Sequence, residues 1–258
     1  TRTYKRAPDL AQTNFVPGWD FINNDAHPND DEGHGTHVTG TVAQSTNNSL
    51  GVAGVAFNTS IMPVKVLDSQ GYGTTQTVAD GIYFATDNGA HVINMSLGWP
   101  PGVDPGTTLR NAVAYAYGQG VTIVCSSGNS GDEPGYSGQV SYPAAYDQYC
   151  IAVGASRYDE AVSYYSSWGS SLDLTAPGGD LNVDQNGDGY GDGVLQQTFG
   201  STPRTFAYYF YQGTSMAAPH VSGVAALLIA SGVAGPDAVR QVLQSTAEDH
   251  GAAGLDPY

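Results

Sequence analysis

Basic side chains are scarce in this sequence of 258 residues. It has 8 Lys and Arg residues against 24 Asp and Glu residues, so its formal net charge is −16. Nucleic acids and anionic membranes are bound through clusters of Lys and Arg, and we therefore expect neither as a partner. The acidic surplus favours solubility and divalent cations, although most of these carboxylates are expected on a solvated surface.

Long apolar runs are absent, and cysteine is nearly so. Because no stretch of about 18 apolar residues exists, we expect no membrane-spanning helix. Cys125 and Cys150 each lie in a short apolar run. They are expected to be either buried free thiols or a disulfide between neighbouring strands. Neither shows the Cys-x-x-Cys spacing of a redox or zinc site. An initial Met and a signal peptide are also missing, so we expect the sequence to be a fragment or a processed product.

The sequence does contain short, β-branched apolar runs that alternate with helical patterns. Strands are predicted at 62–67, 91–97, 121–127 and 150–155, and helices at 75–89, 107–120, 214–231 and 236–248. Strands that are apolar throughout and alternate with helices predict a buried parallel sheet covered on both faces. We therefore expect an α/β fold, a doubly wound and mostly parallel sheet with helices on both faces, as one domain over residues 1–258.

Four glycine- and serine-rich motifs follow one another along the chain: GHGTHV (33–38), SLG (96–98), SSGNSG (126–131) and GTSMAAPH (213–220). A lone serine such as Ser215 at a helix start is usually a cap, and a lone loop asparagine such as Asn129 is usually a turn residue. In parallel α/β sheets, however, sites form beyond the carboxyl ends of the strands, where such loops gather. Together and in this order, the motifs resemble the subtilisin-like serine peptidases (the subtilase family) over essentially the whole chain.

The resemblance implies a role for each motif. Ser215 is the expected nucleophile, and His34 is the expected general base and then general acid. Asn129 matches the family's oxyanion donor, with the backbone N–H of Ser215 as the second donor. His37 is expected to be structural, because two histidines at this spacing leave the coordination of a metal incomplete.

The resemblance also implies where a substrate would lie. An extended peptide is expected to pair with the SLG segment, and the P1 side chain is expected between that segment and the loops at 126–129 and 141–144. Because no charged side chain falls at the aligned pocket positions, we expect a neutral or apolar P1 residue. The expected substrate contacts are Ser96, Leu97, Gly98, Ser127, Gly128 and Ser141.

Calcium is the cofactor that the resemblance implies, and hard oxygen ligands on loops suit Ca²⁺. The family's strong site is matched by Asp9, Thr46, Asn48, Leu50 and Val52. A calcium loop of the thermitase-like branch is matched by Asp20, Asn23, Asp25, His27 and Asn29, with an Asx-rich turn as the alternative. An EF-hand-like half-loop is suggested, independently of the family, by Asp184, Asn186, Asp188 and Asp192. We expect this last stretch to be a calcium-binding insertion at 180–200 rather than a bare acidic loop.

One part of the family pattern has no match. An aspartate in an Asp-Thr/Ser-Gly motif, at the end of the family's first strand, orients the histidine. Nothing before His34 fits, so we expect this acid on a strand upstream of residue 1. Asp30 and Asp31 are the alternatives within the chain. The last residues, GLDPY, are expected to stop short of the family's final segment.

The resulting hypothesis is a secreted, monomeric, calcium-stabilised serine endopeptidase that hydrolyses proteins or peptides through an acyl-enzyme on Ser215. A propeptide removed on maturation is a further expected partner. The alternative is a catalytically silent domain of the same fold that binds peptide or calcium. Retention of Ser215, His34 and Asn129 favours the enzyme, but the chain alone is expected to be poorly active without the orienting acid.

Overall fold

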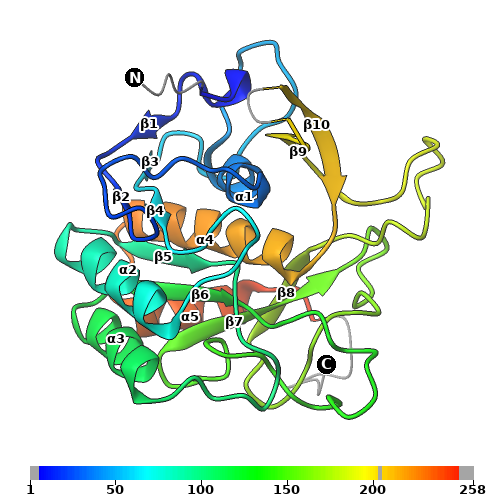
Figure 1. Ribbon diagram of the computed structural model, residues 1–258. Coiled ribbons are helices and arrows are strands. Elements are labelled where there is room, and N and C mark those ends of the chain that lie inside the picture. The colour runs from blue at the N-terminus through cyan, green and yellow to red at the C-terminus, as the bar shows by residue number, and fades with distance from the viewer. Residues whose placement is uncertain (1–5, 203–204, 250–258) are drawn as a thin grey trace.

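The parallel sheet at the centre of the molecule has the predicted layered form. The computed structural model describes residues 6–202 and 205–249, and the expectation for GLDPY lies outside them. Helices cover both faces of the sheet, so the doubly wound α/β fold is confirmed (Figure 1). The four parallel strands run in the order β5 (Val92–Met95), β6 (Thr122–Ser126), β7 (Cys150–Ser156) and β8 (Leu174–Pro177).

Two cores flank this sheet. On one face lie α2 (Thr75–Asp87) and α3 (Thr107–Gly118), and on the other lie α4 (Thr214–Ala230) and α5 (Pro236–Thr246). In β6, Ile123 and Cys125 pack toward α2 and α3, whereas Val124 packs toward α4. Successive strand side chains point to opposite faces, so an apolar residue is needed at every position of a strand buried on both sides.

The remaining strands lie outside the main sheet. They form two parallel pairs and one antiparallel hairpin, and the hairpin packs against α1 (His34–Ala43). The predicted strand at 62–67 is reduced to two paired residues, because only one of its edges has a partner among the described residues. The pairs are β1 (Asn14–Phe15) with β3 (Ser60–Ile61), β2 (Trp19–Asp20) with β4 (Val64–Lys65), and β9 (Val194–Phe199) with β10 (Phe206–Tyr211), and a 3-10 turn, η1, spans Pro8–Leu10.

The helix limits follow local chemistry. The Thr74 hydroxyl and the Thr77 side chain form a reciprocal capping box at the start of α2. Gly89, with a left-handed φ of 82°, follows the end of that helix. Pro236 is the first residue of α5, where its missing N–H costs nothing. The four predicted helices are therefore confirmed, each ending one or two residues earlier than predicted.

The two cysteines are free, buried thiols. They lie on neighbouring strands but not opposite each other, because Cys125 faces Ala152 and Cys150 faces Ile123. Burial and the adjacent Cys150 thiol raise the pKa of the Cys125 thiol well above its usual value. Both therefore serve as small apolar core residues.

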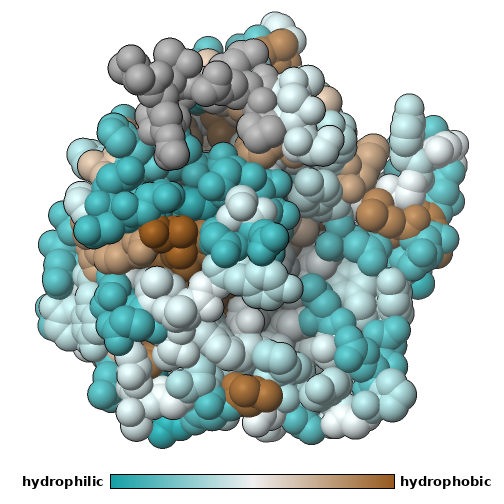
Figure 2. Space-filling view, in the orientation of Figure 1, coloured by the Kyte–Doolittle hydropathy of each residue, from teal (hydrophilic) through white to brown (hydrophobic). Residues whose placement is uncertain are grey.

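The visible surface is mostly hydrophilic, with apolar side chains in small separate patches (Figure 2). No helix in residues 6–202 and 205–249 is long and apolar enough to cross a membrane.

Candidate active site

Ser215 is the second residue of α4 and lies half-buried at its start. Gly213 precedes the helix with φ 144° and ψ 160°, a conformation that favours glycine. The first N–H groups of a helix have no partner inside the helix, and the N–H of Ser215 donates to no group in the described chain. The Ser215 Oγ lies 3.5 Å from the carbonyl oxygen of Ser96, so the hydroxyl is only weakly held.

Asn129 is held beside this helix start by its side-chain oxygen. The N–H and the hydroxyl of Thr214 both donate to Asn129 Oδ1, each at 2.9 Å. This pairing fixes the orientation of the amide and leaves the Nδ2 hydrogens without an acceptor in residues 6–202 and 205–249. Two unengaged N–H donors, one from Asn129 and one from Ser215, therefore accompany the serine hydroxyl, as an oxyanion site requires.

His34 is the first residue of α1 and lines a large cavity. Burial lowers the pKa of His34, while the charges of Glu32 and Asp30 oppose this shift. Its ring makes no hydrogen bond within the described chain, so the structure does not join it to Ser215. No hydrogen bond in that part of the chain therefore fixes the tautomer of the ring.

The two acids considered as internal substitutes are engaged elsewhere. The carboxylate of Asp30 accepts the N–H groups of Glu32, Gly33 and Thr36, and it therefore caps α1. Asp31 forms a salt bridge with Lys65 at 2.6 Å. Neither carboxylate contacts the His34 ring, so this alternative is not supported.

His37 joins α1 to the β9–β10 hairpin. It is fully buried, its Nε2 lies 3.1 Å from Val194 O and 3.2 Å from Tyr209 O, and its ring stacks on Tyr211 at a centroid distance of 4.3 Å. The expected structural role agrees with this geometry. Sequence reasoning missed the hairpin itself, although the aromatic run FAYYFY favours a strand.

The three segments expected to bind substrate lie together. Trp99 N donates to Tyr142 O at 2.8 Å, which joins the SLG segment to the 141–144 loop. A Cβ at Gly98 would lie 2.6 Å from Tyr142 O, and one at Gly128 would lie 2.2 Å from Ser141 Oγ. Ser127 is buried, and its hydroxyl donates to Ser167 O at 2.8 Å. These segments contain no Asp, Glu, Lys, Arg or His.

The residues of the strong calcium site converge in part. Asp9 is fully buried and forms no salt bridge in the part of the chain that the structure describes. Its carboxylate accepts hydrogen bonds from the side chains of Gln44, Asn48 and Tyr208. Asn48 Oδ1 accepts the N–H of Leu50, and no side-chain contact joins Thr46 or Val52 to Asp9. It is the Asn48 Nδ2 group that faces the carboxylate, and a buried carboxylate with no cationic partner in the described chain fits a hard cation.

The two other acidic loops consist of local turns. In the first, Asp20 accepts the N–H groups of Ile22 and Asn23 and the Asn23 amide, and Asn29 donates to the carbonyl of His27. Asp25 accepts the N–H of His27, so these polar groups bond to one another rather than converge.

In the second loop, Asp184 accepts the N–H groups of Gly187, Asp188 and Gly189. Asn186 Oδ1 shares the Asp188 N–H, and Asp192 is buried with one carboxylate oxygen unpaired. No three His, Cys, Asp or Glu side chains of the described residues converge to hold a metal.

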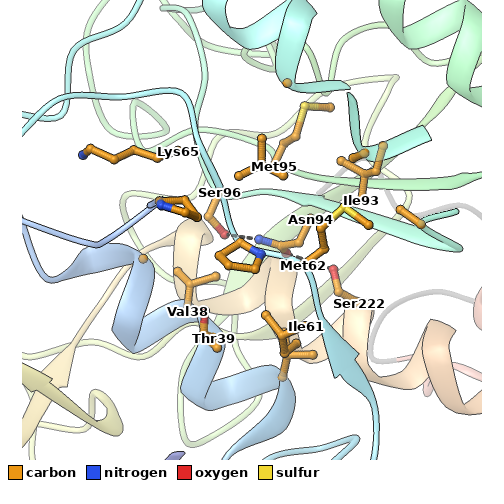
Figure 3. A pocket seen from close by; sticks show the side chains of 18 of the residues that line it. Val38, Thr39, Ile61, Met62, Lys65, Ile93, Asn94, Met95, Ser96 and Ser222 are labelled. Atoms are coloured by element: carbon orange, nitrogen blue, oxygen red, sulfur yellow. Dashed lines mark hydrogen bonds between the residues drawn. The ribbon is translucent and has the colours of Figure 1, made fainter. Parts of the chain in front are cut away.

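A cavity of about 2020 Å³ lies between β4 and β5. Residues of α1 and α4 line it from one face of the sheet, and residues of α2 line it from the other. Side chains labelled in Figure 3, among them Val38, Met62, Ile93 and Met95, surround this space. In the described chain β4 pairs only with β2 and β5 only with β6, so the cavity separates two unpaired parallel edges. The cavity lies where one more strand would join β4 to β5.

Known proteins resemble this chain over most of its length. The model of the subtilase family matches residues 2–257. Thermitase from Thermoactinomyces vulgaris is 40% identical over 241 residues, which are 93% of this chain and 76% of thermitase. The thermophilic serine proteinase from Bacillus sp. (strain AK1) is 40% identical over 93% of this chain, which spans about half (53%) of that relative's length. A protease structure from Pseudoalteromonas arctica PAMC 21717 superimposes with a TM-score of 0.81 at 36% identity, covering 93% of this chain and 79% of that one.

Proposed function

The chain belongs to the subtilase family, the subtilisin-like serine endopeptidases, and on that premise we propose that Ser215, His34 and Asn129 hydrolyse peptide bonds in it. The observation that carries this assignment is the start of α4. There the Ser215 hydroxyl lies with two N–H donors, its own and that of Asn129 Nδ2, that have no partner in the described residues. A tetrahedral intermediate needs such a pair, and each donor is worth about 3–4 kcal/mol in the transition state.

The reaction has two halves. Ser215 Oγ forms a bond to the substrate carbonyl carbon while His34 takes the hydroxyl proton, and the carbonyl oxygen becomes an anion held by the two N–H donors. The C–N bond then breaks, and His34 returns the proton to the leaving amine. A water molecule attacks the acyl-enzyme in the same way, His34 again taking and returning the proton, which releases the acid and free Ser215.

The orienting acid is proposed to come from a strand that occupies the cavity between β4 and β5. Two unpaired parallel edges and apolar linings on both faces support a parallel, apolar strand there. His34 lines the same cavity, and we propose that an aspartate at the end of this strand contacts its ring. We expect the strand to be upstream of residue 1 in the natural protein.

The test of the assignment is the Ser215→Ala variant of the natural protein. We expect hydrolysis of a peptide anilide to fall to background while the circular dichroism spectrum and melting temperature stay unchanged. Ser137→Ala, which removes an exposed serine, is the matched control and should leave turnover unchanged. Undiminished hydrolysis by Ser215→Ala would refute the assignment, and a parent protein with no hydrolysis would support a silent, peptide-binding domain instead.

The substrate is proposed to be an extended peptide alongside Ser96, Leu97 and Gly98, with a neutral or apolar P1 side chain. Support comes from the close contacts of the SLG segment with the 141–144 loop and of Gly128 with Ser141, and from the absence of Asp, Glu, Lys, Arg and His in these segments. A panel of peptide anilides that differ only at P1 tests this preference. Faster turnover of substrates with Lys, Arg, Asp or Glu at P1 would contradict it.

Calcium is proposed as a structural cofactor, most directly at Asp9. Asn48 lies beside the buried Asp9 carboxylate, and carbonyl groups of Thr46, Leu50 and Val52 are proposed to complete the ligand set. A bound Ca²⁺ would be the cationic partner that this buried carboxylate otherwise lacks in the described chain. The loops at 20–29 and 184–192 are proposed as further sites, supported by their oxygen-rich composition and, in the second, by the unpaired buried oxygen of Asp192.

The natural protein is further proposed to be a secreted monomer made with a removable propeptide. Calcium sites of this kind suit the calcium-rich extracellular medium, and small, separate apolar patches on the visible face suit a monomer. Activity confined to the cell lysate would contradict secretion, and a dimer in light scattering would contradict the monomer. A mature N-terminus identical to the translated one would contradict the propeptide.

A further inference from the structure

A one-way series of hydrogen bonds runs from the middle of α4 to the carbonyl of Ser215. The Ser222 hydroxyl donates to Asn94 Oδ1 at 2.9 Å, and Asn94 Nδ2 donates to Ser96 Oγ at 3.0 Å. The Ser96 hydroxyl then donates to Ser215 O at 2.8 Å. Figure 3 shows Ser96, Asn94 and Ser222 beside one another at the cavity. Each group donates to the next, so the bonds polarise one another in the same sense.

The last acceptor in this series lacks its usual partner. In an α-helix the carbonyl of residue i accepts the N–H of residue i+4, which for Ser215 is residue 219. That residue is Pro219, inside α4, and proline has no N–H. The Ser96 hydroxyl therefore replaces a helical bond that the sequence of α4 cannot make. The replacement ties the backbone of the proposed nucleophile to the segment just after β5.

Asn94 and Ser222 precede Ser96 in this series of hydrogen bonds. Ser222 is buried, its hydroxyl lies between Asn94 Oδ1 and Ala218 O at 2.9 and 3.1 Å, and it is two helical turns from Ser215. Asn94 is the third residue of β5 and uses both ends of its amide in the series. An asparagine fixed at both ends gives the Ser96 oxygen one defined donor, so the Ser96 hydrogen is directed to Ser215 O.

We propose that Asn94 and Ser222 are positioning residues of the active site: they orient the Ser96 hydroxyl, which holds the Ser215 carbonyl that Pro219 leaves without a helical donor. This inference rests on the proposed function of Ser215. Its consequence is that the Ser215 hydroxyl and the Ser215 N–H keep a fixed place relative to Asn129. Loss of the series should lower the rate of acylation and leave substrate affinity nearly unchanged, because the peptide is proposed to pair with the backbone of residues 96–98, whereas the Ser96 hydroxyl donates to Ser215 O.

The test measures kcat, KM and the rate of fluorophosphonate labelling of Ser215 in the natural protein. Ser96→Ala should lower kcat and the labelling rate about tenfold, the effect of one hydrogen bond, with little change in KM. Asn94→Ala should show a smaller loss of the same kind. The double variant should be no slower than Ser96→Ala, because both changes remove the same positioning effect.

The same Ser96→Ala change should also be measured in a Pro219→Ala protein. Pro219→Ala restores an N–H four residues after Ser215, so Ser96→Ala should cost much less activity there than in the parent. Thr86→Val is the control, since it removes a hydroxyl that donates to Ile82 O at 2.8 Å in α2, and should change stability without changing kcat.

Three results would overturn the proposal: an unchanged kcat in Ser96→Ala and Asn94→Ala, additive losses in the double variant, or an equal cost of Ser96→Ala with and without Pro219. These results presuppose that the parent labels at Ser215. A parent that does not label would instead refute the proposed function, so the two failures are distinguishable.

Discussion

Two histidines only three residues apart have different surroundings and therefore different expected behaviour. His34 lines the cavity and has no hydrogen-bond partner for its ring in the described residues, whereas His37 is fully buried between α1 and the β9–β10 hairpin. Burial lowers the pKa of His37 to about 4. The carbonyls of Tyr209 and Val194 oppose the shift, and the charges of His34 and His220 add slightly to it. His37 is thus neutral in the folded protein at neutral pH.

This difference predicts acid sensitivity from His37. Its folded pKa lies below the value of about 6.5 in the unfolded chain, so the unfolded state binds the proton first as pH falls. Its contribution to stability is full above pH 6.5 and is lost as pH falls from there to about 4, by about 3 kcal/mol in all. Urea unfolding between pH 8 and 4 measures the loss, and His37→Gln should flatten that part of the profile. An equal slope in the variant would assign the loss to other groups.

At the scale of elements, the sequence predicted those parts whose pattern is repeated and apolar. The helices α2 to α5 and the strands β5, β6 and β7 were predicted correctly, because their apolar residues recur at helical spacing or fill a short continuous run. The β8 strand was missed because its half-buried LTAP residues form no apolar run, and β9 was missed because VLQQTF contains polar residues. The aromatic run FAYYFY of β10 was a signal for a strand that sequence reasoning missed. Asn129 and Thr214 bond to each other at the start of α4, next to Ser215, and the motifs had predicted that Asn129 and Ser215 lie together. The bonds from the N–H groups of α1 to Asp30 could not be predicted, because spacing along the sequence does not fix where a side chain points.

The loop from Thr46 to Val52 and the turn containing Asp9 are the elements for which calcium should matter most. Ligand that binds only the folded state adds RT ln(1 + [L]/Kd), or about 2.7 kcal/mol at a hundredfold excess over Kd. EDTA should therefore lower the melting temperature of the parent and speed its autolysis. In Asp9→Asn the melting temperature should already be low, and EDTA should lower it less.

Asp184→Asn provides the matched comparison, since it removes one acidic charge from the exposed loop at 184–192. If calcium occupies that loop as well, EDTA should also lower the melting temperature of this variant less than that of the parent. An unchanged melting curve of the parent in EDTA, together with no calcium by elemental analysis, would contradict the calcium proposal at every site.

At the scale of the whole molecule, the cavity between β4 and β5 interrupts the sheet. The short pairs β1–β3 and β2–β4 lie on one side of it and the sheet from β5 to β8 lies on the other, while α1 and α2 reach across to contact β3 and β4. Unpaired parallel edges favour aggregation. A strand placed between them would continue the sheet from β4 to β8 and would also reach His34.

Residues 1–258 expressed alone should therefore be poorly soluble and slow beside a chain extended upstream by about forty residues. In subtilisin itself, loss of the orienting aspartate lowers kcat roughly 3 × 10⁴-fold. We expect a difference of that order between the two proteins in turnover of a peptide anilide. Replacing the upstream aspartate with Asn in the extended chain separates the chemical loss from the structural one. Equal turnover by a soluble 1–258 chain would show that the acid lies within these residues.

The identity of the nucleophile is tested most directly by peptide mapping of the natural protein after reaction with a fluorophosphonate. The probe phosphonylates an activated serine and needs no knowledge of the substrate. The account predicts one adduct, on the peptide that contains GTSMAAPH and at Ser215, which disappears in Ser215→Ala. An adduct on a different serine, or no adduct in a folded protein that hydrolyses peptides, would contradict it.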